Sequence, residues 1–371
     1  MLQETATAVP SATSLADAGR AVLEQAIAAR AFPGAAFGVL CRGETLAVDS
    51  VGRFTYEIDA PAVQPETLFD LASVSKVIAT TTAAMILHSR GLLDLDTRLG
   101  DMLPGFVIGM EPGSGKERVT LRMLLAHSSG LPGYVTFFRE HTTAEGLMRA
   151  ALRVPLEAKP GTRTEYSDPG YILLGKVIEV LSGECLDTFC VREIFTPLQL
   201  QNTRFRPPAS LHSAIPPTEN DTTFRRRVIQ GEVQDENAFV LGGVAGHAGV
   251  FSNVRDLLTF AQCIIDQGRT ASGGRLFSPE TLVVFAERQS TPDGKSRALG
   301  WDVPTPPSST GQYFGPRSIG HLGYAGTSLW IDPDQALAIA LLTNRTWPDR
   351  SSDAIRQVRP AFHDAIVEAL R

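Results

Sequence analysis

The chain has 371 residues, which exceeds the usual size of one domain and predicts one large domain or two closely packed ones. Its apolar fraction of 43% and charged fraction of 20% are typical of a globular protein with a substantial core. A net charge of -6 gives no basic surface for nucleic acid, and no segment approaches the ~20 apolar residues that span a bilayer.

The chain ends share a pattern of strands and covering helices. Apolar residues at helical spacing predict helices over residues 15–31 and 351–371, and Pro360 should bend or restart the second one. Short apolar or alternating segments predict strands at residues 35–41, 45–51, 328–331 and 336–342. The simplest assembly is one antiparallel sheet built from both chain ends, with the terminal helices packed on one face.

The middle of the chain predicts helices. Residues 77–87 are apolar or small all round, as in a fully buried helix, and Thr120 should cap a short helix over residues 121–127. Asp168 followed by Pro169 predicts an N-cap that opens a helix over residues 170–181.

These patterns predict two domains. Residues 1–73 and 241–371 would form the sheet domain with its terminal helices, and residues 74–240 a mostly helical domain inserted into it. We expect the active site to lie between the two.

Three local features bear on partners and compartment. The basic run at residues 225–227 (RRR) lacks interleaved aromatic residues, so we interpret it as a solvated loop or edge strand. The four cysteines form no C-x-x-C pair and are expected to be buried free thiols. Residues 1–14 contain no basic or apolar signal region, which predicts a cytoplasmic protein, or a periplasmic or secreted one if a leader precedes this sequence.

Several common catalytic motifs are missing from the sequence. It contains no G-x-S-x-G nucleophile elbow, and the segment GSGK at residues 113–116 lacks the remaining residues of a phosphate loop. The histidines are scattered without ligand spacing, so neither a metal nor an organic cofactor is expected.

Ser73 and Lys76 form an S-x-x-K at the start of the predicted buried helix. Residues three apart lie on one helical face, so the Lys76 amine should reach the Ser73 hydroxyl. Burial disfavours a charged lysine and can bring its pKa towards neutrality, where it acts as a base. Lys76 is the one charged residue in the otherwise uncharged stretch from Leu71 to Leu87, which favours this interpretation over a serine and a lysine that merely share a helix.

Three ordered segments resemble the serine β-lactamase and penicillin-binding protein superfamily. Within it, they are most similar to class C β-lactamase-like serine hydrolases, which include D,D-peptidases and family VIII esterases. The segments are FDLASVSKVIATTTAAMI (69–86), PGTRTEYSDPGYILLG (160–175) and GHLGYAGTSLWIDP (320–333). The resemblance implies an α+β fold of the serine β-lactamase/transpeptidase type, with an antiparallel sheet flanked by terminal helices and an inserted helical domain.

The resemblance also implies roles for individual residues. Ser73 would be the nucleophile and Lys76 its general base. Tyr166, in the second family element, would pass the proton to the leaving group, although an aromatic side chain at a helix entrance also suits plain packing. The backbone N–H groups of Ser73 and Tyr324 would form the oxyanion hole.

Four further positions would contact substrate, and three of them depart from the family pattern. Asp168 stands where asparagine is common and lacks an amide donor; alternatively it serves only as a helix cap. His321 replaces a lysine but resembles the histidine of some D,D-peptidases. Leu322 replaces a hydroxyl residue that would hold a substrate carboxylate, while Gly323 permits close backbone approach.

The remaining candidates are weaker. His127 and His247 are expected to be structural, and Trp301 and Tyr324 are candidates to line the pocket.

Together these features predict a serine hydrolase that acts through an acyl-enzyme on Ser73, with small carboxylic esters or related acyl compounds as substrates. A β-lactamase or D,D-peptidase is one alternative, and a penicillin-binding sensor that acylates without turnover is another. The expected partner is a small-molecule ester, amide or β-lactam, not nucleic acid, and the oligomeric state is left open.

Overall fold

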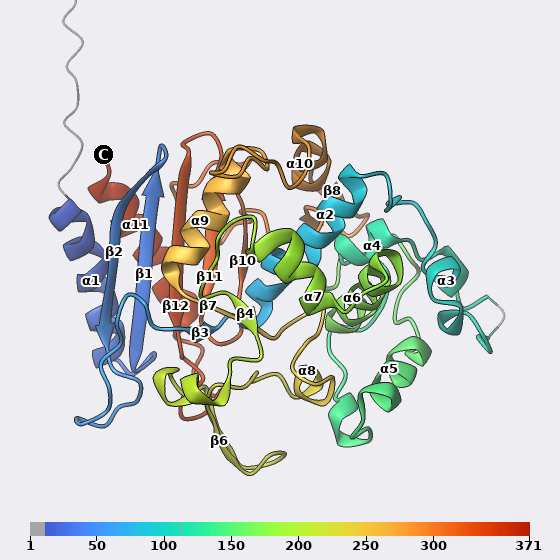
Figure 1. Cartoon of the computed structure of the whole chain (residues 1–371), viewed down its shortest axis with the longest axis horizontal. Helices are drawn as coiled ribbons and strands as arrows, with labels where there is room; N and C mark the ends of the chain where they lie inside the picture. Colours follow the sequence, from blue (N-terminus) through green and yellow to red (C-terminus); the bar gives the residue numbers. More distant parts are fainter. Residues whose placement is uncertain (1–11, 112) are drawn as a thin grey trace, which may run out of the picture.

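The structure is a computed structural model and describes residues 12–111 and 113–371. Its largest sheet has five antiparallel strands in the order β10-β11-β12-β1-β2. The strands are β1 (Gly34–Cys41), β2 (Glu44–Gly52), β10 (Ile319–Leu322), β11 (Ser328–Asp332) and β12 (Leu337–Thr343). The two chain ends meet where β1 pairs with β12, and Figure 1 shows these strands side by side. The sheet predicted from the sequence is thus confirmed.

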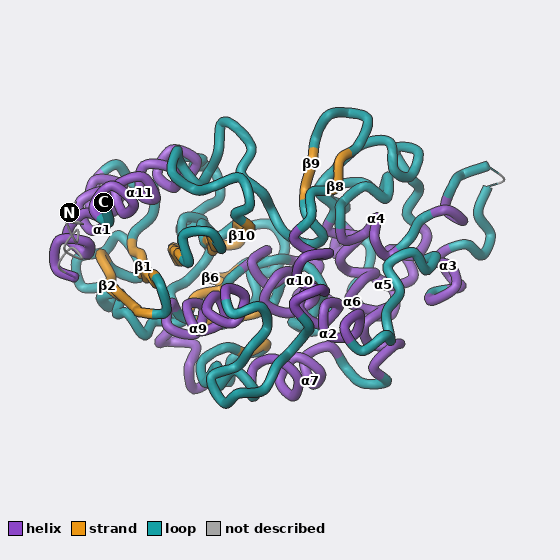
Figure 2. The backbone as a smooth tube through the Cα atoms, turned by 90° about the horizontal axis from the view of Figure 1, so that it is seen from above, coloured by secondary structure: helices purple, strands orange, loops and turns teal. Residues whose placement is uncertain are grey.

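The terminal helices cover one face of this sheet. Helices α1 (Ala12–Ala28) and α11 (Ile355–Ala369) lie next to each other, as Figure 2 shows. Phe37 of β1 packs edge-on against Phe362 of α11, with ring centroids 5.3 Å apart. Pro360 lies inside α11, so the C-terminal segment forms one helix and does not restart.

The opposite face of the sheet carries the larger hydrophobic core. Helix α9 (Val254–Ile265) packs on β1, β11 and β12 there. The same core continues without interruption into the helical part of the molecule. Figure 1 places that part to the right of the sheet.

The helical part consists of short helices joined by loops and small strand pairs. The helices are α2 (Thr82–Ser89), α3 (Leu99–Met102), α4 (Leu121–Leu125), α5 (Ala144–Arg153), α6 (Asp168–Ser182), α7 (Leu186–Cys190), α8 (Glu236–Val240) and, further along the chain, α10 (Pro279–Ala286). The small strands are β3 (Phe69–Asp70), β4 (Arg204–Phe205), β5 (Glu219–Asp221), β6 (Arg227–Ile229), β7 (Val250–Ser252), β8 (Gln289–Ser290) and β9 (Ser296–Arg297). The division of the chain into two domains stays a prediction.

The predicted buried helix at residues 77–87 is not α-helical at its start. A 3₁₀ turn covers Ala72–Val74 and a π-helical turn covers Lys76–Thr81, before α2 begins. Buried threonine hydroxyls satisfy carbonyls here: Thr82 Oγ1 donates to Val77 O at 2.7 Å, and Thr80 Oγ1 to Gly246 O at 2.7 Å. The first bond gives a carbonyl of the π-helical turn a side-chain partner, and the second ties the turn to the backbone at Gly246.

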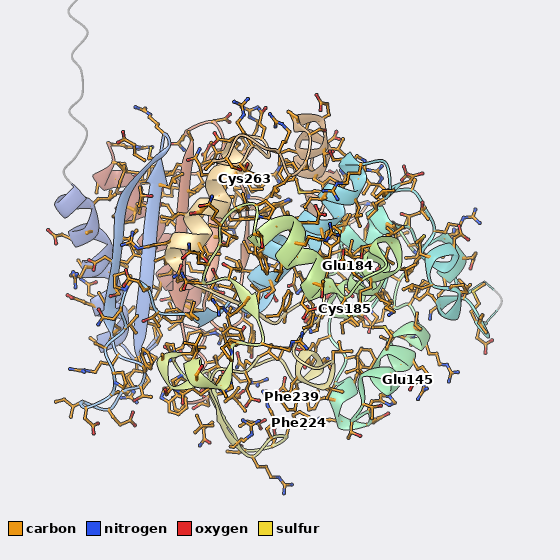
Figure 3. The ribbon with its side chains drawn as sticks, in the orientation of Figure 1. Glu145, Glu184, Cys185, Phe224, Phe239 and Cys263 are labelled. Carbon is orange, nitrogen blue, oxygen red and sulfur yellow. The ribbon has the colours of Figure 1, made fainter. Side chains whose placement is uncertain are left out.

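The basic run at residues 225–227 is only partly solvated, which corrects the sequence interpretation. The Arg225 side chain is 3% exposed, donates to Val233 O at 2.7 Å and lies 4.9 Å from the Phe239 ring centroid. Phe224 and Phe239 lie close to each other in Figure 3, with ring centroids 6.1 Å apart. This packing fixes the segment that leads into α8.

The four cysteines are free thiols, as predicted, but not all are buried. Cys190 and Cys263 are buried, Cys41 is half-buried and Cys185 is exposed. Across the described residues, no helix is both long and apolar enough to cross a membrane.

Candidate active site

Lys76 lies at the centre of the site and is fully buried, with 0% of its surface exposed. Its Nζ donates to Ser73 Oγ at 3.1 Å, to Asp168 Oδ1 at 2.7 Å and to the His247 carbonyl at 3.1 Å. Three acceptors match the three hydrogens of an ammonium group. The S-x-x-K therefore brings the two side chains together as its spacing predicts, and Asp168 adds an ion pair that the spacing does not predict.

The backbone that presents Ser73 is strained and held from behind. Ala72 has a φ of 47°, which is unfavourable for a residue with a side chain. The buried Asp70 carboxylate accepts from the Ala72 N–H at 2.8 Å and from the Gln234 N–H at 2.7 Å. Burial raises the pKa of Asp70 to about 6, although these backbone bonds act in the opposite direction. Asp70 thus ties the Ser73 turn to the loop before α8.

Tyr166 stands directly against this pair. Its ring centroid lies 4.7 Å from Lys76 Nζ and 5.2 Å from the Arg297 guanidinium carbon. Burial, and then the charge of Asp168, raise the pKa of Tyr166 well above its usual value, so the side chain is a neutral hydroxyl. The hydroxyl has no partner with regular hydrogen-bond geometry among the described residues, although Ser73 is near enough to lower its pKa. As a neutral hydroxyl it has a proton that it can donate.

His127 supports Tyr166 from behind. Its Nδ1 accepts from the Ser167 N–H at 2.9 Å, and its ring lies 4.5 Å from that of Tyr166 and 5.1 Å from that of Tyr171. Burial lowers the pKa of His127 well below its usual value, so the ring is neutral. These contacts suit the structural role expected from the sequence.

Helix α6 is capped by Ser167 and not by Asp168, which corrects the predicted cap. Ser167 Oγ accepts from the Gly170 N–H at 3.1 Å and donates to Pro132 O at 2.7 Å. Asp168 is the first residue of the helix, and its side chain, 16% exposed, turns to Lys76. A serine one residue earlier does the capping and leaves the carboxylate available to the site.

His321 is a neutral acceptor in this structure. Its Nδ1 donates to the Leu322 carbonyl at 2.8 Å, so its buried Nε2 carries a lone pair and has no partner among the described residues. Burial, followed by the charges of Arg297 and Lys76, lowers the pKa of His321 well below its usual value. His321 therefore does not supply the positive charge of the lysine it replaces.

The end of β10 is packed tightly against the Ser73 turn. A Cβ on Gly323 would lie 1.9 Å from Thr327 Oγ1 and 2.5 Å from the Leu71 carbonyl, so only glycine fits. Thr327 Oγ1 donates to that same carbonyl at 2.8 Å. Tyr324 follows Gly323 directly, and its backbone N–H donates to no group in the described part of the chain. The arrangement suits the predicted oxyanion hole.

Two pockets meet at Ser73 and Tyr166. The first, of about 550 Å³, we call the arginine pocket. Its charged lining residues are Arg345, Arg350, Arg356, Arg359, Asp302 and Asp353. The second, of about 320 Å³, we call the acidic pocket. Its charged lining residues are Asp168, Asp235, Glu236 and Arg350. Tyr324 lines both, as the sequence suggested.

Several arginines near the site were not predicted from the sequence. Arg359 Nη2 donates to the carbonyls of Gly323 and Thr327, both at 2.8 Å, and Arg345 Nε donates to the Tyr324 carbonyl at 2.7 Å. Arg297 forms an ion pair with Asp302 at 2.7 Å. No motif surrounds these arginines, and only the folded chain brings them to the site.

Trp301 does not line either pocket, which corrects another expectation. It is fully buried and stacks on Phe260 in the core, with ring centroids 6.4 Å apart. Within the described ranges, no group of three or more His, Cys, Asp or Glu side chains is arranged to hold a metal ion.

Comparison with known proteins assigns nearly the whole chain to one family. The sequence profile of the Beta-lactamase family matches residues 20–361. An N-acetylmuramyl-L-alanine amidase of Bacillus subtilis (strain 168) is 33% identical over 360 residues, which cover 87% of this chain and 79% of that protein.

Two solved structures share the fold. EstCE1, a hydrolase with promiscuous acyltransferase activity, superposes with a TM-score of 0.73 at 23% identity, covering 95% of this chain and 99% of that one. A class C β-lactamase from Rhodobacter sphaeroides superposes with a TM-score of 0.72 at 23% identity, covering 96% and 100%. At this identity the likeness shows the fold alone, which is the predicted serine β-lactamase/transpeptidase type.

The fold and the family together define a serine hydrolase. The chain belongs to the Beta-lactamase family.

Proposed function

We propose that this enzyme hydrolyses acyl compounds through an ester on Ser73 Oγ, and that small carboxylic esters are its preferred substrates. One observation carries the proposal: Lys76 Nζ lies 3.1 Å from Ser73 Oγ at the point where the two pockets meet. A nucleophile within hydrogen-bond reach of its base, beside space for substrate on both sides, is what acyl transfer requires.

Acylation uses Lys76 in its amine form as the base, after the ammonium of the resting enzyme has released one proton to solvent. Ser73 Oγ attacks the substrate carbonyl carbon as its proton passes to Lys76 Nζ. The carbonyl oxygen becomes an oxyanion, and the N–H groups of Ser73 and Tyr324 stabilise it. Asp168, 2.7 Å from Nζ, stabilises the ammonium that results.

Collapse of the intermediate needs a proton on the leaving oxygen. The neutral Tyr166 hydroxyl supplies it and recovers a proton from the Lys76 ammonium near its ring. A water molecule then attacks the acyl carbon by the same route in reverse. Carboxylic acid leaves, and the Ser73 hydroxyl and the Lys76 amine are restored.

Short neutral esters need only these groups. Leu322 offers no hydroxyl, and the neutral His321 offers no charge, to a carboxylate held beside β10. Asp168 presents a negative charge where asparagine would present an amide donor. These features weaken the binding of penicillins and cephalosporins relative to neutral esters.

The arginine pocket favours a second candidate, a D,D-peptidase or β-lactamase. Arg356 is exposed at its mouth, and Arg345 and Arg359 lie deeper with backbone carbonyls as their acceptors. Such a surface suits a leaving group that carries a carboxylate. The Bacillus subtilis relative is named as an amidase, which also supports nitrogen leaving groups.

A substrate panel separates the two candidates. We expect kcat/KM for p-nitrophenyl acetate or butyrate to exceed that for nitrocefin by at least about tenfold, a difference of ~1.4 kcal/mol. Faster hydrolysis of nitrocefin would replace the esterase with a β-lactamase. A single equivalent of product without further turnover would instead identify a sensor that is acylated only once.

A further inference from the structure

The acidic pocket has more carboxylates than cations. Asp168, Asp235 and Glu236 line it, and Arg350 is the one arginine or lysine among its lining residues. Arg350 is itself shared, since it donates to Glu236 at 3.0 Å and to Glu219 at 2.7 Å. Lys76, behind the wall, forms its ion pair with Asp168. The pocket therefore keeps a net negative charge.

The pKa of the neighbouring Tyr134 reflects this negative charge. Tyr134 lines the same pocket, and burial raises the pKa of its hydroxyl, followed by the charges of Asp235, Glu236 and Asp168. All three carboxylates thus act on one point of the pocket wall. A positively charged group placed there would be attracted by each of them.

His247 adds an acceptor without a partner. His247 Nε2 donates to the Asp235 carboxylate at 2.8 Å, so Nε2 carries a hydrogen, and the other ring nitrogen of this neutral tautomer, Nδ1, has a lone pair. His247 is 1% exposed and lines the pocket, and its Nδ1 has no hydrogen-bond partner among the described residues. An ammonium N–H in the pocket could donate a hydrogen bond to this nitrogen.

Hydrogen bonding and packing hold the wall of the acidic pocket in place. Its side chains are not arranged to hold a metal ion. Asp235 caps α8 by accepting from the Ala238 N–H at 2.7 Å, and Phe239 of that helix packs on Phe224, as Figure 3 shows. No set of three metal-ligating side chains occurs here or elsewhere in residues 12–111 and 113–371. An organic cation therefore fits the pocket better than a metal ion.

We propose that the acidic pocket binds a protonated amine on the acyl group of the substrate, so that aminoacyl esters and amides are preferred over uncharged ones. We place the acyl group in this smaller pocket, where the three carboxylates and His247 Nδ1 would surround its amine. The leaving group departs through the larger arginine pocket, whose mouth carries the exposed Asp353 and Arg356. This inference rests on the proposed function and narrows its substrate class.

A matched ester pair tests the charge preference directly. Ethyl 3-aminopropanoate and ethyl butanoate differ by an ammonium in place of a methyl group, and acid release in a pH-stat at pH 7 follows both. We expect kcat/KM for the amino ester to be at least about tenfold higher. We also expect 0.5 M NaCl to reduce this ratio in the wild-type enzyme, because salt screens the attraction.

Two single-residue variants test whether the acidic pocket causes the preference for the amino ester. Glu236→Gln keeps an acceptor for Arg350 and removes one charge, so the ratio of the two kcat/KM values should fall several-fold. Glu145→Gln is the matched control, since Glu145 is an exposed carboxylate on α5 that lines neither pocket (Figure 3), and the ratio should not change.

The outcomes are distinct. Equal rates for both esters, or a ratio that neither salt nor Glu236→Gln changes, would overturn this inference and leave the proposed function in place. Hydrolysis of neither this ester pair nor the p-nitrophenyl esters would overturn the proposed function, and this inference with it.

Discussion

Lys76 is fully buried, and its Nζ donates to the Asp168 carboxylate at 2.7 Å. The sequence showed a lysine among apolar residues and so predicted its burial but not this ion pair. The ion pair depends on a residue 92 positions further along the chain, which only the fold brings into contact.

Loss of the Lys76 amine should stop the reaction. Because nucleophile and base act as a unit, Lys76→Ala should lower kcat/KM for p-nitrophenyl butyrate by a factor on the order of 10^4. Lys176→Ala is the control, since Lys176 is a half-exposed helical lysine paired with Glu179. A Lys76→Ala enzyme with more than a few per cent of wild-type activity would remove Lys76 from the mechanism.

Tyr166→Phe removes the hydroxyl that we expect to protonate the leaving group. The variant should fold normally and lose most of its turnover in steady-state assays. The pKa of Tyr166 is raised well above its usual value, so the wild-type pH profile should show no limb from this tyrosine between pH 5 and 10. Tyr171→Phe is a control, because the Tyr171 hydroxyl already pairs with Thr81 at 3.1 Å. Equal losses in both variants would argue against the relay.

At the scale of elements, short strand β3 anchors the nucleophile. Asp70, its last residue, holds the strained Ala72 and the loop before α8 through two backbone N–H groups. The sequence shows Asp70 only as an aspartate near a serine. Its role arises from burial and from contact with residue 234.

Asp70 should make stability depend on pH. Its folded-state pKa of about 6 lies above the ordinary value of 3.8, so the folded chain binds this proton more tightly. The stabilisation is fully present below the ordinary value and is lost as pH rises through about 6. We expect the free energy of unfolding of the wild type, relative to Asp70→Asn, to fall by about 2 kcal/mol between pH 4 and pH 7. Denaturant titrations that give a constant difference would contradict this.

The side-chain cap of α6 should contribute more to the free energy of unfolding than an ordinary surface cap. Ser167→Ala removes an acceptor for the Gly170 N–H and a donor to Pro132, both buried, and should cost about 1–2 kcal/mol of unfolding free energy. Thr143→Ala on α5 removes a more exposed cap and should cost less. Since Ser167 separates Tyr166 from Asp168, its loss should also lower kcat. Wild-type kcat in a destabilised Ser167→Ala would show that the cap does not position the site.

Local patterns predicted the elements that depend on neighbouring residues. The apolar and alternating segments predicted four strands of the main sheet, β1, β2, β11 and β12, but not β10, and Thr120 caps its helix by accepting from the Met123 N–H at 3.3 Å. The π-helical turn at Lys76–Thr81 was missed because it depends on hydroxyl bonds that include the distant Gly246. The cap at Asp168 was wrong by one residue because two adjacent side chains are both good caps.

At the scale of the whole molecule, the site is formed where distant parts of the chain meet. Ser73 lies between an arginine pocket built mainly from residues 302–359 and an acidic pocket built mainly from residues 134–168 and 234–248. Motif spacing could predict the contact between Ser73 and Lys76, because only two residues separate them in the chain. The charge of each pocket was not predictable, since it is set by pairings between those segments.

The most direct test of the account is the mass of the acylated enzyme. Rapidly quenched reactions with p-nitrophenyl butyrate should show one added butyryl group, located by peptide mapping on the peptide that contains Ser73. Ser75→Ala should still be labelled, because the Ser75 hydroxyl only accepts from the Val250 N–H at 3.0 Å. Ser73→Ala should show neither the adduct nor turnover. Turnover that persists in Ser73→Ala, or an adduct on another residue, would contradict the assignment of Ser73 as nucleophile.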